Sequence, residues 1–109
     1  MCVQAATRMA NDLRANNQRP LFAEIHFRCQ GRVYSSTGRF GPNTPISFSG
    51  YHVGVLQRGI VHCNVHPEGR PIQLWFNDFW TPHSVITQTP PMRTVSPFPL
   101  SQDFYPPWR

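Results

Sequence analysis

Apolar residues recur at three- and four-residue intervals at the start of the chain, which predicts an amphipathic helix over residues 1–17. The asparagine pair at 16–17, followed by Pro20, predicts the end of this helix. Its apolar face is expected to consist of Val3, Ala6, Met9 or Ala10, and Leu13.

The period changes to two over residues 21–28, which predicts a strand with one buried face. A partner strand is expected over residues 32–36, after a turn at Gly31. His26 falls on the polar face and is interpreted as a solvated side chain. The buried face is expected to hold Leu21, Ala23, Ile25 and Phe27, and the polar face Phe22, Glu24, His26 and Arg28.

The stretch from Ser49 to Glu68 predicts a β-hairpin, because two β-branched runs flank a turn at residues 57–59. Such a turn is expected to place His52 opposite Cys63 or Asn64. Directly opposed residues have Cβ atoms about 5 Å apart. A polar group of the facing strand would then orient the imidazole.

The other segments complete an α+β domain. Residues 37–49 predict a long loop, because they are rich in Gly, Pro, Ser, Thr and Asn. Residues 71–79 predict a short helix that starts at a proline, and residues 83–88 an edge strand. Half of the 12 prolines lie in residues 89–109, which predicts an extended or disordered tail, or one lying across the domain. The expected organisation is therefore a domain over 1–88 and a tail over 89–109.

Composition narrows the function classes. The 109 residues carry a net charge of +5, and every one of the ten basic side chains is an arginine, which favours acidic partners. No nucleic-acid-binding motif, signal peptide or membrane-length apolar run is present, so neither a nucleic acid nor a membrane is the expected partner. The three cysteines form no C-x-x-C pair. We therefore expect a reducing compartment, no metal and no cofactor.

One constellation suggests chemistry. Cys2 stands at the predicted helix start, where the backbone N–H groups favour a thiolate. His52 is the candidate base, and Asn64 is the candidate that orients it. The backbone N–H of Cys2 would be one oxyanion donor. A structural Cys2 remains open at this point, since cysteine is often a buried core residue. Cys29 and Cys63 are interpreted as core residues.

The chain also resembles a known family. It contains Cys-Val-x-x-Ala, Gly-Tyr-His-Val-Gly-Val, Gly-Ile-Val-x-x-Asn-x-His-Pro-Glu-Gly and Trp-Phe-Asn-Asp-Phe in that order. These motifs, spread over residues 2–80, are similar to the small papain-fold toxin domains of bacterial polymorphic toxin systems. In particular, they resemble the branch called papain fold toxin 2, whose members are thought to be glutamine deamidases.

The resemblance implies a papain-like fold, with Cys2 as nucleophile on an N-terminal helix and His52 as base on a small antiparallel sheet. Two features depart from the family pattern. Cys63, followed by Asn64, stands where an orienting aspartate is common, and only Met1 precedes Cys2 where a glutamine oxyanion donor is expected. Either Asn64 is the third residue of a Cys-His-Asn triad, or the triad is altered and its activity is weaker. Another side chain, such as Gln4, could supply the oxyanion donor, but the favoured expectation is that the chain is cut from a longer toxin.

The function that follows is deamidation of a glutamine side chain on a target protein, with proteolysis or transglutamination as alternatives. Such a toxin would be secreted or delivered by a bacterial secretion system. It would act in the cytoplasm of a competitor or host cell, and an acidic immunity protein would inhibit it. A different class remains open, namely a non-catalytic, arginine-rich binding module whose proline-rich tail docks a partner.

Overall fold

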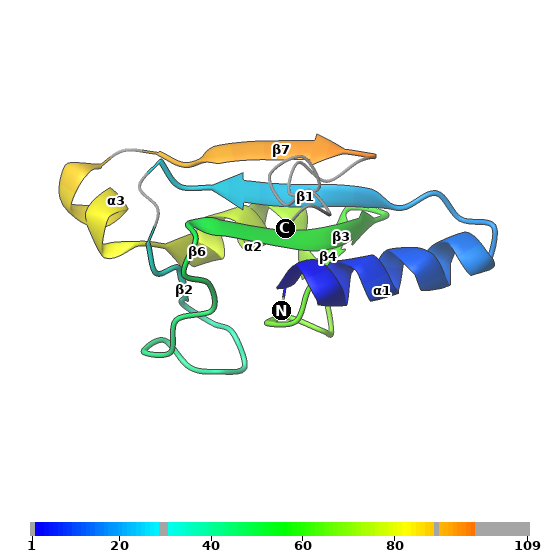
Figure 1. Cartoon of the computed structure of the whole chain (residues 1–109), viewed down its shortest axis with the longest axis horizontal. Helices are drawn as coiled ribbons and strands as arrows, with labels where there is room; N and C mark the ends of the chain where they lie inside the picture. Colours follow the sequence, from blue (N-terminus) through cyan, green and yellow to red (C-terminus); the bar gives the residue numbers. More distant parts are fainter. Residues whose placement is uncertain (1, 29–30, 89, 98–109) are drawn as a thin grey trace, which may run out of the picture.

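The computed structural model describes residues 2–28, 31–88 and 90–97. It is an α+β protein with an N-terminal helix and a five-stranded antiparallel sheet (Figure 1). The strand order in the sheet is β5-β4-β3-β1-β7, and β2 and β6 form a separate pair. The elements are α1 (Cys2–Ala15), β1 (Leu21–His26), β2 (Tyr34–Ser35), β3 (Tyr51–Gln57), β4 (Ile60–His62), β5 (Arg70–Pro71), α2 (Ile72–Asp78), β6 (Phe79–Trp80), α3 (Pro82–Thr87) and β7 (Met92–Ser96).

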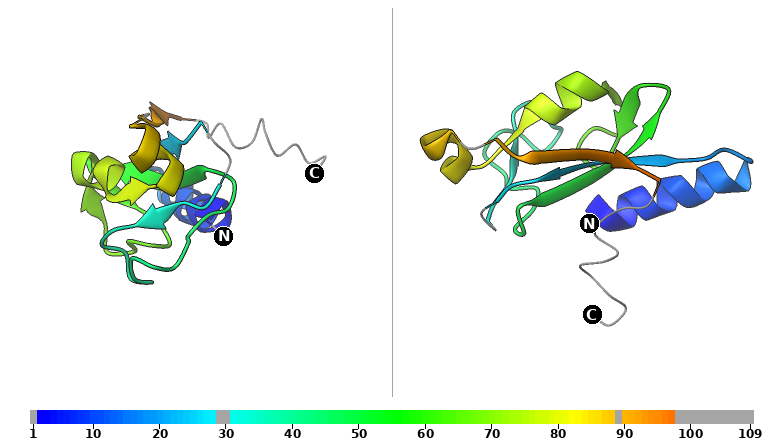
Figure 2. Two further views of the ribbon diagram at one scale, coloured as in Figure 1. Left: turned by 90° about the vertical axis from the view of Figure 1, so that its left-hand side faces the viewer. Right: turned by 90° about the horizontal axis from the view of Figure 1, so that it is seen from above.

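The sheet lies between α1 and α2, which cover opposite faces (Figure 2). Ala6 and Ala10 of α1 pack on one face, and Trp75 of α2 packs on the other. Both faces of β1 are therefore buried, and even Glu24 is only 1% exposed. The prediction of a strand at 21–28 is confirmed over residues 21–26. The prediction of one solvated face is wrong, because α1 folds back over that face.

The C-terminal end of α1 and the turn of the β3–β4 hairpin are both set by local backbone conformation. Asn17 adopts a left-handed conformation with φ 61°, and the N–H of Gln18 donates to the Leu13 carbonyl, so the helix stops where the asparagine pair predicts. Arg58 and Gly59 form the two-residue turn between β3 and β4, with φ values of 55° and 79°. This positive-φ pair matches the twist of the strands, and the predicted hairpin is confirmed.

Two predicted strands turn out differently. Residues 34–35 form β2, but β2 pairs with β6, whereas the neighbours of β1 are β3 and β7. Residues 83–88 do not form an edge strand. Thr81 instead caps α3, because its side chain accepts the Ser84 N–H, while Pro82 occupies the first helical turn.

Part of the predicted tail belongs to the sheet. Strand β7 pairs antiparallel with β1 from Phe22↔Ser96 to His26↔Met92. Residues 98–109 lie outside the described residues. None of the helices in the described part of the chain is long and apolar enough to cross a membrane.

Candidate functional site

His52 does not lie opposite Cys63 or Asn64, so this prediction is wrong. Strand β4 ends at His62, and the hairpin register begins with Gln57↔Ile60 and Val55↔His62. On its other side, β3 pairs His52 with Ile25 of β1. The hairpin closes by a two-residue turn, and its second strand is too short to reach His52.

The imidazole of His52 is enclosed by aromatic rings. It stacks on Trp75 at 5.5 Å between ring centroids, and the ring of Phe79 lies 4.6 Å away. The side chain is 0% exposed, and neither ring nitrogen has a hydrogen-bond partner among the described residues. Burial lowers the pKa of His52 to about 3, with a further contribution from His66. His52 is thus a neutral ring in the α2-side core.

Asn64 and Cys63 occupy the connector after β4. The Asn64 carbonyl accepts a hydrogen bond from Arg39 Nε at 2.8 Å, and its side-chain Oδ1 has no partner among the described residues. Cys63 is buried, as expected, and its Sγ accepts from the His66 N–H and from Trp75 Nε1, each at 3.4 Å. Neither residue forms a hydrogen bond to the His52 ring, whose two nitrogens have no partner among the described residues. The structure therefore does not assemble His52 and Asn64 as a pair.

A buried polar network lies next to His52 on the α2 side of the sheet. His66 Nε2 is 2.8 Å from Asp78 Oδ2, and the Ser35 hydroxyl donates to the same oxygen. Asp78 Oδ1 accepts from the N–H and hydroxyl of Thr37 at 2.9 and 2.6 Å. Burial alone would raise the pKa of Asp78, but the hydrogen bonds from Ser35, Thr37 and His66 lower it.

Sequence reasoning missed this network, although His66 and Asp78 stand in two of the motifs quoted for the resemblance. Its residues have the types of a Ser-His-Asp triad but not the geometry. Ser35 and Asp78 both face Nε2 of His66, whereas a triad places them on opposite ring nitrogens. Ser35 is also only 1% exposed. We interpret the network as a structural tie between β2, the β4–β5 connector and α2.

A second cluster of titratable side chains lies on the face that α1 covers. Tyr51 donates its hydroxyl to Glu24 Oε2 at 2.5 Å, and the His26 ring packs edge-on against Tyr51 with centroids 4.7 Å apart. Burial lowers the pKa of His26, and the charge of Glu24 opposes that shift. His26 is half-buried and so remains reachable from solvent. His26 is therefore a candidate general base, with the carboxylate of Glu24 beside it.

Cys2 is the first residue of α1, and its side chain lies outside the described part of the structure. The helix runs in the same direction as β3, and its start lies below the middle of the sheet in the view of Figure 1. Since α1 packs on the face opposite the His52 ring, the structure does not bring α1 and His52 together. The same packing places α1 on the side of His26.

The described residues contain no group of three or more His, Cys, Asp and Glu side chains that could hold a metal ion. Comparisons with family models, with curated proteins and with solved structures found no match to this chain.

Proposed function

We propose that this chain is a papain-like, cysteine-dependent amidohydrolase that deamidates glutamine side chains of a target protein. The observation that carries the proposal is the position of α1. This helix begins at Cys2 and packs on the sheet face that presents His26, Glu24 and Tyr51. A cysteine at a helix start, a reachable imidazole and a carboxylate beside it are what thiol-based amide hydrolysis requires.

In the proposed reaction, the Cys2 thiolate attacks the amide carbon of glutamine and forms a tetrahedral oxyanion. The backbone N–H of Cys2 is one donor to that oxyanion. The imidazolium then protonates the amide nitrogen, the C–N bond breaks, and ammonia leaves a thioester. Water, deprotonated by the same imidazole, hydrolyses the thioester to glutamate and regenerates Cys2. If an amine instead of water attacks the thioester, the reaction is transglutamination. If the thiolate attacks a backbone amide instead of a glutamine side chain, the reaction is proteolysis.

The packing changes which residue we assign as the general base. The resemblance assigns the base to His52, and Asn64 is the sequence's candidate for orienting it. In the folded chain His52 is enclosed among aromatic rings and faces away from α1. We therefore assign the base to His26, with Glu24 stabilising its protonated form through charge.

The biological setting follows from the resemblance. The domain acts as the toxin of a bacterial polymorphic system, delivered into the cytoplasm of a competitor or host cell. An immunity protein in the producing cell binds and inhibits it. The net charge of +5 supports an acidic surface on that inhibitor.

The test is a proteome-wide count of glutamine-to-glutamate conversions, each a gain of about 1 Da, in a bacterial lysate incubated with the protein. We expect conversions with wild type, none with Cys2→Ala, and roughly 100-fold fewer with His26→Gln. His52→Phe should retain activity. Circular dichroism of each variant controls for folding.

Two outcomes would count against this reading. Activity that survives in Cys2→Ala, or no conversion with wild type, contradicts the amidohydrolase proposal. Activity lost in His52→Phe but kept in His26→Gln returns the base to His52.

A non-catalytic binding module is the second candidate, and one observation favours it. The structure does not assemble the Cys2, His52 and Asn64 set that the sequence predicts. This module would show no Cys2-dependent chemistry. Alkylation of Cys2 by iodoacetamide at the rate of an ordinary exposed thiol would support it over the enzyme.

A further inference from the structure

Tyr51 contacts both of the side chains to which we assign the proton transfer, Glu24 and His26. Its hydroxyl donates to Glu24 Oε2 at 2.5 Å, and its ring meets the His26 ring edge-on, with centroids 4.7 Å apart and planes at 83°. In the proposed reaction Tyr51 itself neither attacks the substrate nor carries a proton. Its position nevertheless connects the carboxylate to the imidazole through one side chain.

The backbone of the sheet fixes these contacts. His26 and Tyr51 stand opposite each other in the β1–β3 ladder, and Glu24 lies two residues before His26, on the same face of β1. The Phe27 N–H donates to the Gly50 carbonyl at 2.8 Å, directly next to this opposed pair. Tyr51 is 3% exposed and Glu24 is 1% exposed, so the contact between them is closed to solvent.

The Tyr51 hydroxyl acts on the charge of Glu24. A carboxylate that is taken out of water needs hydrogen bonds to compensate for the lost hydration. The hydrogen bond from Tyr51 therefore stabilises the ionised form of the buried Glu24. The charge of Glu24 in turn favours protonated His26 and opposes the burial that lowers the pKa of that ring. The hydroxyl thus influences the imidazole through the carboxylate.

The other strands and α1 bring few charges to this place. Among the described residues, Glu24 is the charged group that acts on His26. Opposite His26 on β7 stands the uncharged Met92, and the guanidinium of the next residue, Arg93, contacts α2 on the other face of the sheet. From α1, the titratable group at the helix start is the Cys2 thiol, which the proposed reaction pairs with this imidazole.

We propose that Tyr51 is a positioning residue of the catalytic site, whose hydroxyl keeps Glu24 ionised beside His26, so that the imidazolium is available to protonate the departing amide nitrogen. This inference rests on the proposed role of His26 as the base. It adds a residue that acts on the base through Glu24 and does not touch the substrate.

The first test follows the protonation of His26 by two-dimensional NMR of the histidine rings in the whole protein, which needs no substrate. Tyr51→Phe keeps the ring that contacts His26 and removes only the hydroxyl. We expect the midpoint for protonation of His26 to move to lower pH in this variant, because a less ionised Glu24 no longer stabilises the imidazolium.

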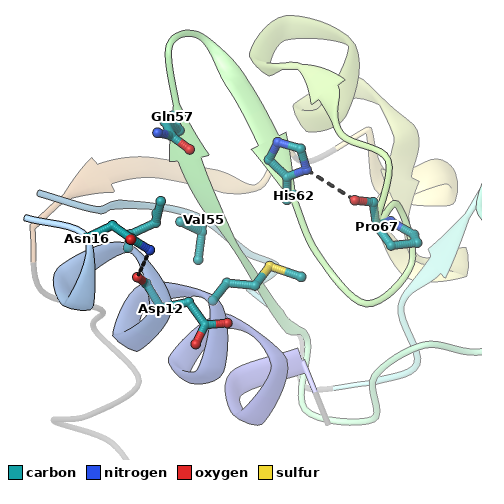
Figure 3. A pocket seen from close by; sticks show the side chains of 8 residues that line it. Asp12, Asn16, Val55, Gln57, His62 and Pro67 are labelled. Atoms are coloured by element: carbon teal, nitrogen blue, oxygen red, sulfur yellow. Dashed lines mark hydrogen bonds between the residues drawn. The ribbon is translucent and has the colours of Figure 1, made fainter. Parts of the chain in front are cut away.

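His62 is the internal reference in the same spectra. It lines a pocket of about 270 Å³ between α1 and the β3–β4 hairpin, and its Nδ1 lies 3.1 Å from the Pro67 carbonyl (Figure 3). Its strand partner is Val55, which follows Tyr51 by four residues, about 13 Å along β3. The His62 signals should therefore titrate at the same pH in the wild type and in Tyr51→Phe.

Further variants show whether Tyr51 acts through Glu24. Glu24→Gln removes the charge and should move the His26 midpoint in the same direction as Tyr51→Phe. In a Glu24→Gln background, Tyr51→Phe should add little further shift, because the two substitutions remove the same effect. The matched control is Tyr34→Phe, which removes the hydroxyl of a half-buried tyrosine stacked on Trp80 and should leave the His26 midpoint unaltered.

The rate of glutamine conversion supplies the second readout. In Tyr51→Phe we expect it to fall roughly tenfold at neutral pH, with the alkaline limb of its pH profile moved to lower pH, because the imidazolium loses its proton earlier. No conversion by the wild type would contradict the deamidase, whereas the NMR titration would still decide whether Tyr51 acts on His26. An unaltered His26 midpoint in Tyr51→Phe, an equal further shift in the Glu24→Gln background, or a slower rate with an unchanged pH profile would each overturn the proposal.

Discussion

The burial of His52 is not compensated by hydrogen bonds among the described residues, where neither of its two buried ring nitrogens has a partner. A buried polar group left unpaired costs about 1–3 kcal/mol. Aromatic stacking with Trp75 and Phe79 needs only the ring, and a phenylalanine supplies that without polar atoms.

We therefore expect His52→Phe to stabilise the fold by about 1 kcal/mol at pH 7. The effect should grow in acid. The folded chain binds the His52 proton only below about 3, whereas the unfolded chain binds it below 6.5. Between these values the unfolded state holds more protons, so the free energy of unfolding of the wild type falls as the pH drops, by about 1.4 kcal/mol per unit.

Urea unfolding at pH 7, 6, 5 and 4 measures this difference. In His52→Phe the decline between pH 6.5 and 3 should be shallower than in the wild type. Gln73→Ala, which changes an exposed, non-titratable side chain on α2, is the control and should leave the slope unchanged. An unaltered slope in His52→Phe, or a loss of stability at every pH, would contradict the placement of this ring.

At the same scale, the sequence predicts which face of a strand a residue occupies better than it predicts what packs against that face. Alternation along residues 21–26 correctly separates Glu24 and His26 from Ala23 and Ile25. It does not show that α1 returns to cover the polar pair, because that contact joins distant segments. His52 was misplaced because the length of β4 depends on where the connector leaves the sheet, which no local pattern specifies.

Among the elements, α2 and the β4–β5 connector depend on one carboxylate. Asp78 ends α2 and receives hydrogen bonds from Ser35 and Thr37, while His66 of the connector lies against it. Asp78→Asn replaces one acceptor oxygen with a donor that faces other donors. We expect this substitution to lower the free energy of unfolding by about 2–4 kcal/mol at pH 7.

Thermal and urea unfolding check this value, and Asn77→Ala, at the exposed neighbouring position, should cost less than about 0.5 kcal/mol. The pKa of Asp78 is lowered in the fold, so its contribution is complete above 3.8 and is lost as the pH falls through the lower folded value. The deficit of Asp78→Asn should therefore shrink in strong acid. A constant deficit from pH 7 to pH 2 would show that the charge is not involved.

The elements that the sequence predicted well are those with a local signal. The Arg58–Gly59 turn and the stop at Asn17 each follow from backbone conformation alone. The helix α3 was missed because residues 83–88 were expected to form an edge strand, although a threonine cap followed by proline can start a helix. Strand β2 pairs with β6 rather than with β1, and the local sequence does not specify this pairing.

For the whole molecule, the C-terminal boundary of the domain depends on the contribution of β7. Without β7, β1 would be an edge strand, although it carries buried residues on both faces. A chain that ends at residue 88 loses the whole Phe22–His26 ladder with β7. It also exposes the unpaired backbone edge of β1, and such edges promote aggregation.

We expect the 1–88 chain to lose on the order of 2–4 kcal/mol of stability relative to a 1–97 chain, since several ladder hydrogen bonds contribute about 1 kcal/mol each. Its amides in β1 should exchange faster in hydrogen-exchange experiments, and its solubility should fall. The full-length protein is the reference for any effect of residues 98–109. If 1–88 matched 1–97 in urea midpoint and in β1 protection, β7 would be an appendage and the boundary at 88 would stand. A loss of stability would instead place the end of the domain after β7, because β1 then needs a neighbour on each side.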